Sequence, residues 1–112
     1  NQINVAATTV DDFMIYFSNR GYRTVNIGAP GVGIFSTVPG NKIEAMDGTS
    51  MSAPLVSGVA ALLLSAYPTA TAQQIKTAIM NSVDMYSGDL QVSSHGRINA
   101  KKALAELQRI RP

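Results

Sequence analysis

The spacing of hydrophobic and polar positions changes near the middle of the 112-residue chain. The first half holds short apolar runs, partly β-branched, separated by Gly, Pro and Asn, which is typical of strands joined by turns. We expect strands over residues 3–7, 25–29 and 33–38, with 42–46 as a further candidate. This half contains no convincing helical repeat of the kind that usually connects two parallel strands.

From Met51 the spacing becomes helical, and apolar residues occupy nearly every face as far as Tyr67. A helix of this kind belongs in the middle of a larger core. Pro68 ends it, because proline disfavours the α conformation in the residue before it. The sequence therefore predicts a long helix that needs a larger core than this chain supplies, and that would expose much of its apolar surface in the chain alone.

Two further helices follow. Thr71 and Gln74 have the spacing of a capping box, and Asn99 can cap the last helix. That helix carries one apolar stripe, formed by Ala100, Ala103, Leu104, Leu107 and Ile110. Strands first and helices later predict an α/β protein in one domain, residues 1–112, whose mostly parallel sheet is incomplete within this chain.

Composition indicates a globular chain with an unusual surface. Hydrophobic residues make up 46% of the chain and charged residues only 14%. Because about a quarter of the residues in a globular domain are usually charged, we expect much of the surface of this chain to lie against other protein. The net charge is +2. We expect the cations of the C-terminal tail to form a solvated helix face rather than a nucleic-acid site. They are Lys101, Lys102, Arg109 and Arg111. With no cysteine, disulfides and thiolate metal sites are excluded.

Neither a leader nor a membrane segment is predicted. No basic stretch followed by an apolar one stands at Asn1. The longest apolar run, residues 54–67, is shorter than the roughly 18 residues that span a bilayer.

The candidate chemistry lies where the polar octet of residues 47–54 enters the long helix. Pro54 is best tolerated in a first helical turn, so Ser50 should lie at or beside the N-cap. There, free backbone N–H groups and the helix dipole would stabilise an oxyanion beside the serine hydroxyl. The plain alternative is capping, since Thr49, Ser50 and Ser52 are all favoured N-cap residues. The Gly-x-Ser-x-Gly elbow of esterases is not met, because Ser52 occupies its last position.

Residues 48–58, Gly-Thr-Ser-Met-Ser-Ala-Pro-Leu-Val-Ser-Gly, resemble the serine-site signature of the subtilisin-like serine proteases. Further segments match family landmarks in the family's order, so the resemblance extends from residue 3 to about residue 107. These segments are residues 5–11, 17–19, 29–31, 34–37 and 96–100. The resemblance implies the C-terminal portion of a three-layer catalytic domain.

The resemblance also implies roles for particular residues. Ser50 would be the nucleophile and its N–H an oxyanion donor, with Thr49 beside the oxyanion. Residues Met46, Asp47 and Gly48 would lie on the leaving-group side of the substrate. Leu55 stands where histidine is common and Asp47 where asparagine is common, departures that concern the subfamily more than the chemistry.

A serine nucleophile needs a general base, and in this family the acid, the base and the oxyanion asparagine precede the serine. The only histidine, His95, follows Ser50 in a loop that lacks the family's histidine motif, so we expect a surface role for it. Asp11 and Asp12 fit a turn rather than a triad acid. Nothing in the sequence assigns Asn1 or Asn4 as the asparagine that would stabilise the oxyanion.

Two functions follow from the sequence. The first is a serine endopeptidase that forms an acyl-enzyme on Ser50, with its acid, base and oxyanion asparagine supplied by an N-terminal part absent from this chain. The second is a non-catalytic binding or assembly module with the same fold elements. An α/β-hydrolase esterase is a distant third.

Under the endopeptidase hypothesis, the substrate is a peptide or protein and the chain alone is inactive. It should pair with the missing N-terminal part or associate with itself. The family resemblance implies secretion. No cofactor is needed for catalysis, but structural calcium is common in complete family members.

Overall fold

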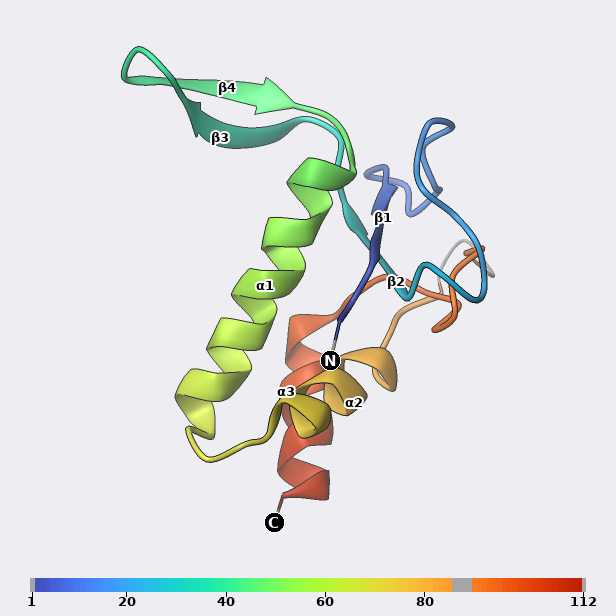
Figure 1. Ribbon diagram of the computed structural model, residues 1–112, viewed down its shortest axis with the longest axis vertical. Helices are drawn as coiled ribbons and strands as arrows, with labels where there is room; N and C mark the ends of the chain where they lie inside the picture. Colours follow the sequence, from blue (N-terminus) through green and yellow to red (C-terminus); the bar gives the residue numbers. More distant parts are fainter. Residues whose placement is uncertain (1, 86–89, 112) are drawn as a thin grey trace.

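Residues 2–85 and 90–111 are described by the computed structural model. They form two parallel strands, an antiparallel hairpin and three helices (Figure 1). In chain order these elements are β1 (Val5–Thr8), β2 (Ile27–Pro30), β3 (Ile34–Val38), β4 (Lys42–Met46), α1 (Thr49–Ala66), α2 (Ala72–Met80) and α3 (Ala100–Ile110). Mixed α/β structure with a fragmentary parallel sheet is confirmed.

Strands β1 and β2 form the centre of the fold. They pair in parallel, with Val5 opposite Ile27 and Thr8 opposite Pro30. The segment between them contains turns and isolated bridges but no helix in the described structure. The predicted lack of a crossover helix is therefore confirmed.

The two faces of this strand pair are covered differently, because successive side chains of a strand point to opposite faces. One face contributes Val5, Ile27 and Ala29 to the main core, which also contains buried residues of all three helices. On the other, Ala6 packs in a smaller cluster with Leu90 and neighbouring residues of the chain. The result is three layers, with helices on one side of the strands and a loop on the other (Figure 1).

Helix α1 leaves much of its apolar surface exposed in this chain, as the sequence predicted for a helix whose larger core is incomplete here. Only Ser52, Val56 and Leu63 are buried in it, whereas the Leu62 side chain is 63% exposed. The physical reason is that β1, β2 and the other helices cover one face of α1, and the described residues supply nothing for the remaining faces. Its 18 residues have a mean hydropathy of 1.5, enough by length and composition to cross a membrane. Core helices of soluble proteins meet the same criterion, and α1 packs on the strand pair.

The predicted caps of α2 and α3 are present. The N–H of Gln74 donates to the Thr71 hydroxyl at 3.1 Å, and the Gln74 side chain accepts from the Thr71 N–H at 2.9 Å. The Asn99 side chain accepts from the Lys102 N–H at 2.9 Å. The stripe of α3, which packs mainly on α2, is buried at Ala103 and Leu107, partly buried at Ile110, and exposed at Ala100 and Leu104.

The tail cations Lys101, Lys102 and Arg109 are exposed to solvent, as the sequence predicted, and three of the four tail cations also make polar contacts. Lys102 binds Asp84, Arg109 binds Glu106, and Arg111 donates to Thr69 and Gln74. Lys102 and Arg111 therefore link α3 to neighbouring segments, whereas the pair of Arg109 and Glu106 lies within α3 itself.

Candidate active site

Ser50 is the second residue of α1. Gly48 is the N-cap, with φ 132° and ψ 170°, so the helix begins two residues earlier than the sequence predicted. Pro54 consequently lies in the second turn, where it cannot donate to the Ser50 carbonyl four residues before it. The reason is that Gly48 adopts a positive φ, which lets the chain turn directly from β4 into the helix.

The capping alternative for Ser50 is not supported by the geometry. No side chain caps the start of α1, and Ser50 itself is exposed. The first turn contains no acidic residue. By helix geometry its leading N–H groups lack intrahelical partners, and the helix dipole makes this end partly positive. An oxyanion that formed beside the Ser50 hydroxyl would meet this positive end.

Ser52 has a structural role that the sequence analysis missed. Its side chain is fully buried, and its hydroxyl donates to the carbonyls of Ala29 at 2.9 Å and Pro30 at 3.1 Å. It therefore ties the first turn of α1 to the end of β2. The sequence did contain a signal for this role. Ser52 follows the exposed Ser50 by two residues in a helix, so its side chain points to a different side of the helix, toward the core.

Gly31 allows α1 to approach β2 closely. A Cβ atom on Gly31 would lie 2.3 Å from Ser52 Oγ, 2.6 Å from Ala7 Cβ and 2.8 Å from the Gly48 carbonyl oxygen. The Gly48 N–H also donates to the Gly31 carbonyl at 2.7 Å. Because these contacts involve buried and backbone atoms, they hold the segment that precedes Ser50 in one position.

Ser50 lines an open cavity of about 550 Å³. Thr49 and Ala53 of α1 line it together with Val5 of β1 and residues of the 19–25 loop, such as Arg20. A second cavity continues from it along α1, sharing Val5 and Ala53 and reaching Ala60. The nucleophile candidate therefore faces an open hollow rather than the interior.

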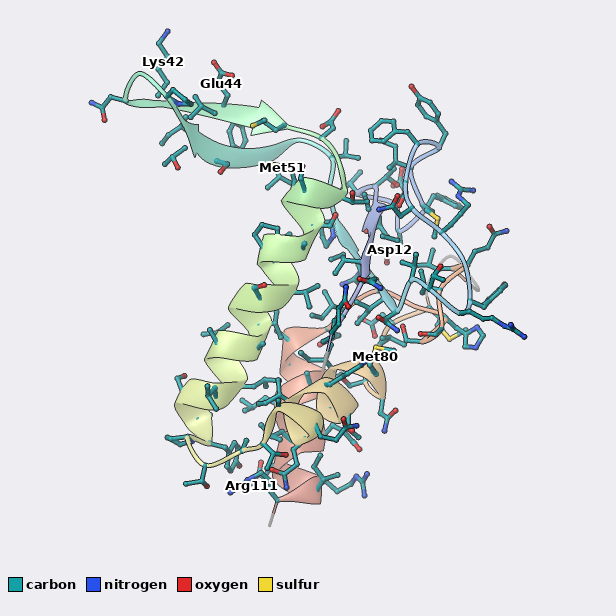
Figure 2. All side chains as sticks on the ribbon, in the orientation of Figure 1. Asp12, Lys42, Glu44, Met51, Met80 and Arg111 are labelled. Carbon is teal, nitrogen blue, oxygen red and sulfur yellow. The ribbon has the colours of Figure 1, made fainter. Side chains whose placement is uncertain are left out.

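The three residues predicted on the leaving-group side join the hairpin to α1. Met46 ends β4 opposite Ile34 and is 42% exposed. Asp47 is exposed, and its Oδ1 accepts from the Gly33 N–H at 2.7 Å. The hairpin projects from the body of the molecule, and Met51 lies at its base, at the start of α1 (Figure 2).

His95 does not approach Ser50. It lies in the 90–97 loop with φ 69°, and its ring centroid is 5.5 Å from that of Tyr22. The neighbouring Ser94 N–H donates to Asn26, just before β2, whereas α1 begins beside Gly31, just after β2. A separation of five strand residues corresponds to about 16 Å. The expected surface role of His95 is consistent with its exposed position.

Asp12 takes part in an ion-pair network rather than a triad. Arg97 Nε donates to Asp12, and Arg97 also contacts the buried Asp84 at 3.4 Å. Burial opposes ionisation of Asp84, but hydrogen bonds from Lys102 and Asn99 and the charges of Lys102 and Arg97 outweigh it. The pKa of Asp84 is therefore lowered from its ordinary value. The network fixes the loops around the start of α3.

Of the other sequence candidates, Asn4 lines the cavity that Ser50 lines, but its side chain is bonded to neighbouring segments, and Asp11 does not line this cavity. Asp11 is exposed in the turn after β1. The Asn4 side chain donates to the Thr24 carbonyl at 2.8 Å and accepts from Gln2. Asn1 lies outside the described residues. Within residues 2–85 and 90–111, no group of three or more carboxylate, histidine or cysteine side chains is placed to hold a metal ion.

Comparison with known proteins matches residues 1–106 to the model of the subtilase family, Peptidase_S8. The chain belongs to the subtilase family. It is 41% identical to thermitase of Thermoactinomyces vulgaris over 104 residues, which is 93% of this chain and 36% of thermitase. It is 39% identical to subtilisin E of Bacillus subtilis strain 168 over 101 residues, which is 90% of this chain and 26% of the relative.

Solved subtilase structures agree with this fold. The self-cleaved protease domain of PatA superposes with a TM-score of 0.83 at 32% identity, covering 96% of this chain and 42% of that one. Fervidolysin from Fervidobacterium pennivorans, a keratinolytic enzyme related to subtilisin, gives 0.78 at 30% identity, covering 92% and 19%. This subtilase chain thus spans about a third or less of the curated relatives named above.

Proposed function

We propose that this subtilase chain carries the nucleophile of a serine endopeptidase, and that Ser50 is the residue acylated by the substrate. The observation that carries the proposal is the exposed position of Ser50 in the uncapped first turn of α1, on the wall of an open cavity. The family match supports it, because the match includes this segment.

In the proposed reaction, the Ser50 hydroxyl attacks a peptide carbonyl and a histidine from another part of the complete protein takes its proton. The oxyanion accepts a hydrogen bond from the Ser50 N–H and one from an asparagine, also from outside this chain, with Thr49 beside it. The protonated histidine then donates to the leaving amine, and water releases the acyl group. Met46, Asp47 and Gly48 would contact the leaving-group side of a peptide or protein substrate.

The remaining expectations belong to the same proposal. The complete protein would be secreted, as the family resemblance implies, and would need no cofactor for catalysis. Any structural calcium, which is common in complete family members, would belong to the complete protein. The acid, the base and the second oxyanion donor would come from an N-terminal part of the domain that packs on this chain.

Labelling with a serine-directed fluorophosphonate tests the nucleophile. The complete protein would be labelled, digested and mapped by mass spectrometry, and we expect label on Ser50 alone. Ser52 is the internal control, because its buried hydroxyl donates to two carbonyls and has no free path to the reagent. Label on another serine, or none in an active preparation, would contradict the assignment.

A non-catalytic binding or assembly module is the second candidate. The observation that favours it is that the described residues place no histidine beside Ser50. The labelling experiment separates the two functions, because a serine without a base should not react faster than free serine. A complete protein that binds peptides, resists the fluorophosphonate and cleaves nothing would establish the second function.

A further inference from the structure

Asp47 places a fixed negative charge just before the proposed nucleophile. It follows the last residue of β4 and precedes the N-cap of α1. Three residues of chain span at most about 11 Å, which sets the upper limit on the distance between the Cα atoms of Asp47 and Ser50. A turn in which the Met51 N–H donates to the Gly48 carbonyl at 3.0 Å shortens this path.

The Asp47 carboxylate is held in one direction. Its Oδ1 accepts from the Gly33 N–H at 2.7 Å, and the next residue, Gly48, donates to Gly31 at 2.7 Å. Residues 47 and 48 are thus bonded to the segment that leads from β2 into β3. A carboxylate anchored in this way keeps its charge near one point of the site, unlike one on a freely rotating side chain.

This charge is not neutralised by the described part of the chain. No lysine or arginine of residues 2–85 or 90–111 forms an ion pair with Asp47. The cation of the same hairpin, Lys42, lies at the far end of β4 and projects from the hairpin together with Glu44 (Figure 2). Because Asp47 is exposed, a substrate that passes Ser50 on this side would meet the uncompensated carboxylate.

We propose that Asp47 is a specificity-determining residue that favours lysine or arginine in the first residues on the leaving-group side of the scissile bond and disfavours glutamate or aspartate there. The inference rests on the proposed endopeptidase function. Charges separated by about a Debye length, ~8 Å at physiological ionic strength, still interact near a low-dielectric surface. Asp47 acts on substrate choice and takes no part in proton transfer.

The test is Asp47→Asn in the complete protein, assayed with internally quenched peptides that differ only in carrying Lys, Gln or Glu on the leaving-group side. The amide oxygen of asparagine can still accept from Gly33, so the substitution removes the charge while the anchor stays. We expect the ratio of kcat/KM for the Lys peptide over the Glu peptide to fall about three- to tenfold. In the unmodified protein, 0.5 M salt should reduce the same ratio.

Glu106→Gln is the matched control, because it makes the same change in net charge on α3, which lies beside the later part of α1 and not beside its start (Figure 1). We expect it to leave the ratio unchanged. An unchanged ratio in Asp47→Asn, or an equal change in the control, would overturn the inference alone. If Ser50→Ala cleaves the neutral Gln peptide as fast as the unmodified protein, or if no peptide is cleaved, the proposed function fails and this inference fails with it.

Discussion

Replacing Gly31 by alanine tests whether the close approach of β2 to α1 positions the candidate nucleophile. The added Cβ would lie 2.6 Å from Ala7 Cβ and 2.8 Å from the Gly48 carbonyl oxygen. Neither atom can move without its backbone. Ser52 Oγ, at 2.3 Å, can rotate away only by giving up its bonds to Ala29 and Pro30. The start of α1 must therefore shift away from the strand.

The expected cost has two parts. Overpacking a well-packed core costs about 1–3 kcal/mol, and each hydrogen bond lost by a buried hydroxyl costs about 1 kcal/mol. We expect the free energy of unfolding to fall by about 2–4 kcal/mol, the sum of these ranges with the two contacts of the single Ser52 hydroxyl proton counted as one bond. A shift of about 1 Å near the reacting atoms lowers a rate about a hundredfold, so kcat should fall by a similar factor.

Urea unfolding of the complete protein, followed by far-UV circular dichroism, and peptide hydrolysis measure the two effects. Gly58→Ala is the matched control, because a Cβ there meets no atom of residues 2–85 or 90–111 within 4 Å outside the helix's own backbone, and the residue lies inside α1. We expect the control to raise the free energy of unfolding by about 0.5–1 kcal/mol, since alanine is a better helix former than glycine. A Gly31→Ala protein that unfolds at the unmodified urea midpoint and retains its kcat would refute the reasoning.

Three further predictions concern Ser50, Asp84 and the isolated chain. Ser50→Ala should abolish peptide hydrolysis in the complete protein. It should change the free energy of unfolding by less than about 0.5 kcal/mol, the usual range for a surface change, because no side chain caps α1. A large loss of stability in urea would instead indicate a structural role for Ser50. The pKa of Asp84 is lowered in the folded protein. Its carboxylate therefore contributes stability that is fully present above the unfolded pKa of about 3.9. This stability is lost as the pH falls through the lower folded pKa. Asp84→Asn should therefore lower the melting temperature at pH 7 and have progressively less effect below about pH 4; an equal loss at pH 2 and pH 7 would argue against the ion network. Residues 1–112 alone should be inactive and associate, because Leu55, Leu62 and Leu64 of α1 are exposed; size-exclusion chromatography with light scattering and a peptidase assay test this, and an active monomer would contradict it.

The sequence by itself determined the elements and the identity of the candidate nucleophile. Short turn-bounded runs predicted the strands, and the side chains of Thr71 and Asn99 predicted two helix starts, because the signals for strands, turns and caps are local. The motif around Ser50 predicted the family that the comparisons then showed. The start of α1 was misplaced by two residues, since the choice between Gly48 and Ser50 as N-cap depends on a backbone angle that the sequence does not display.

Tertiary structure alone decided how the site is held. The contact of Gly31 with Ser52, the anchoring of Asp47 by Gly33 and the pairing of Asp84 with Lys102 all join residues at least 14 positions apart. No local pattern encodes such contacts, because they depend on how the strands and helices pack. The same holds for α1, whose composition predicted a place in a larger core but not which of its faces this chain covers. How much of an apolar helix is buried depends on which elements pack against it, and here the described chain covers one face only.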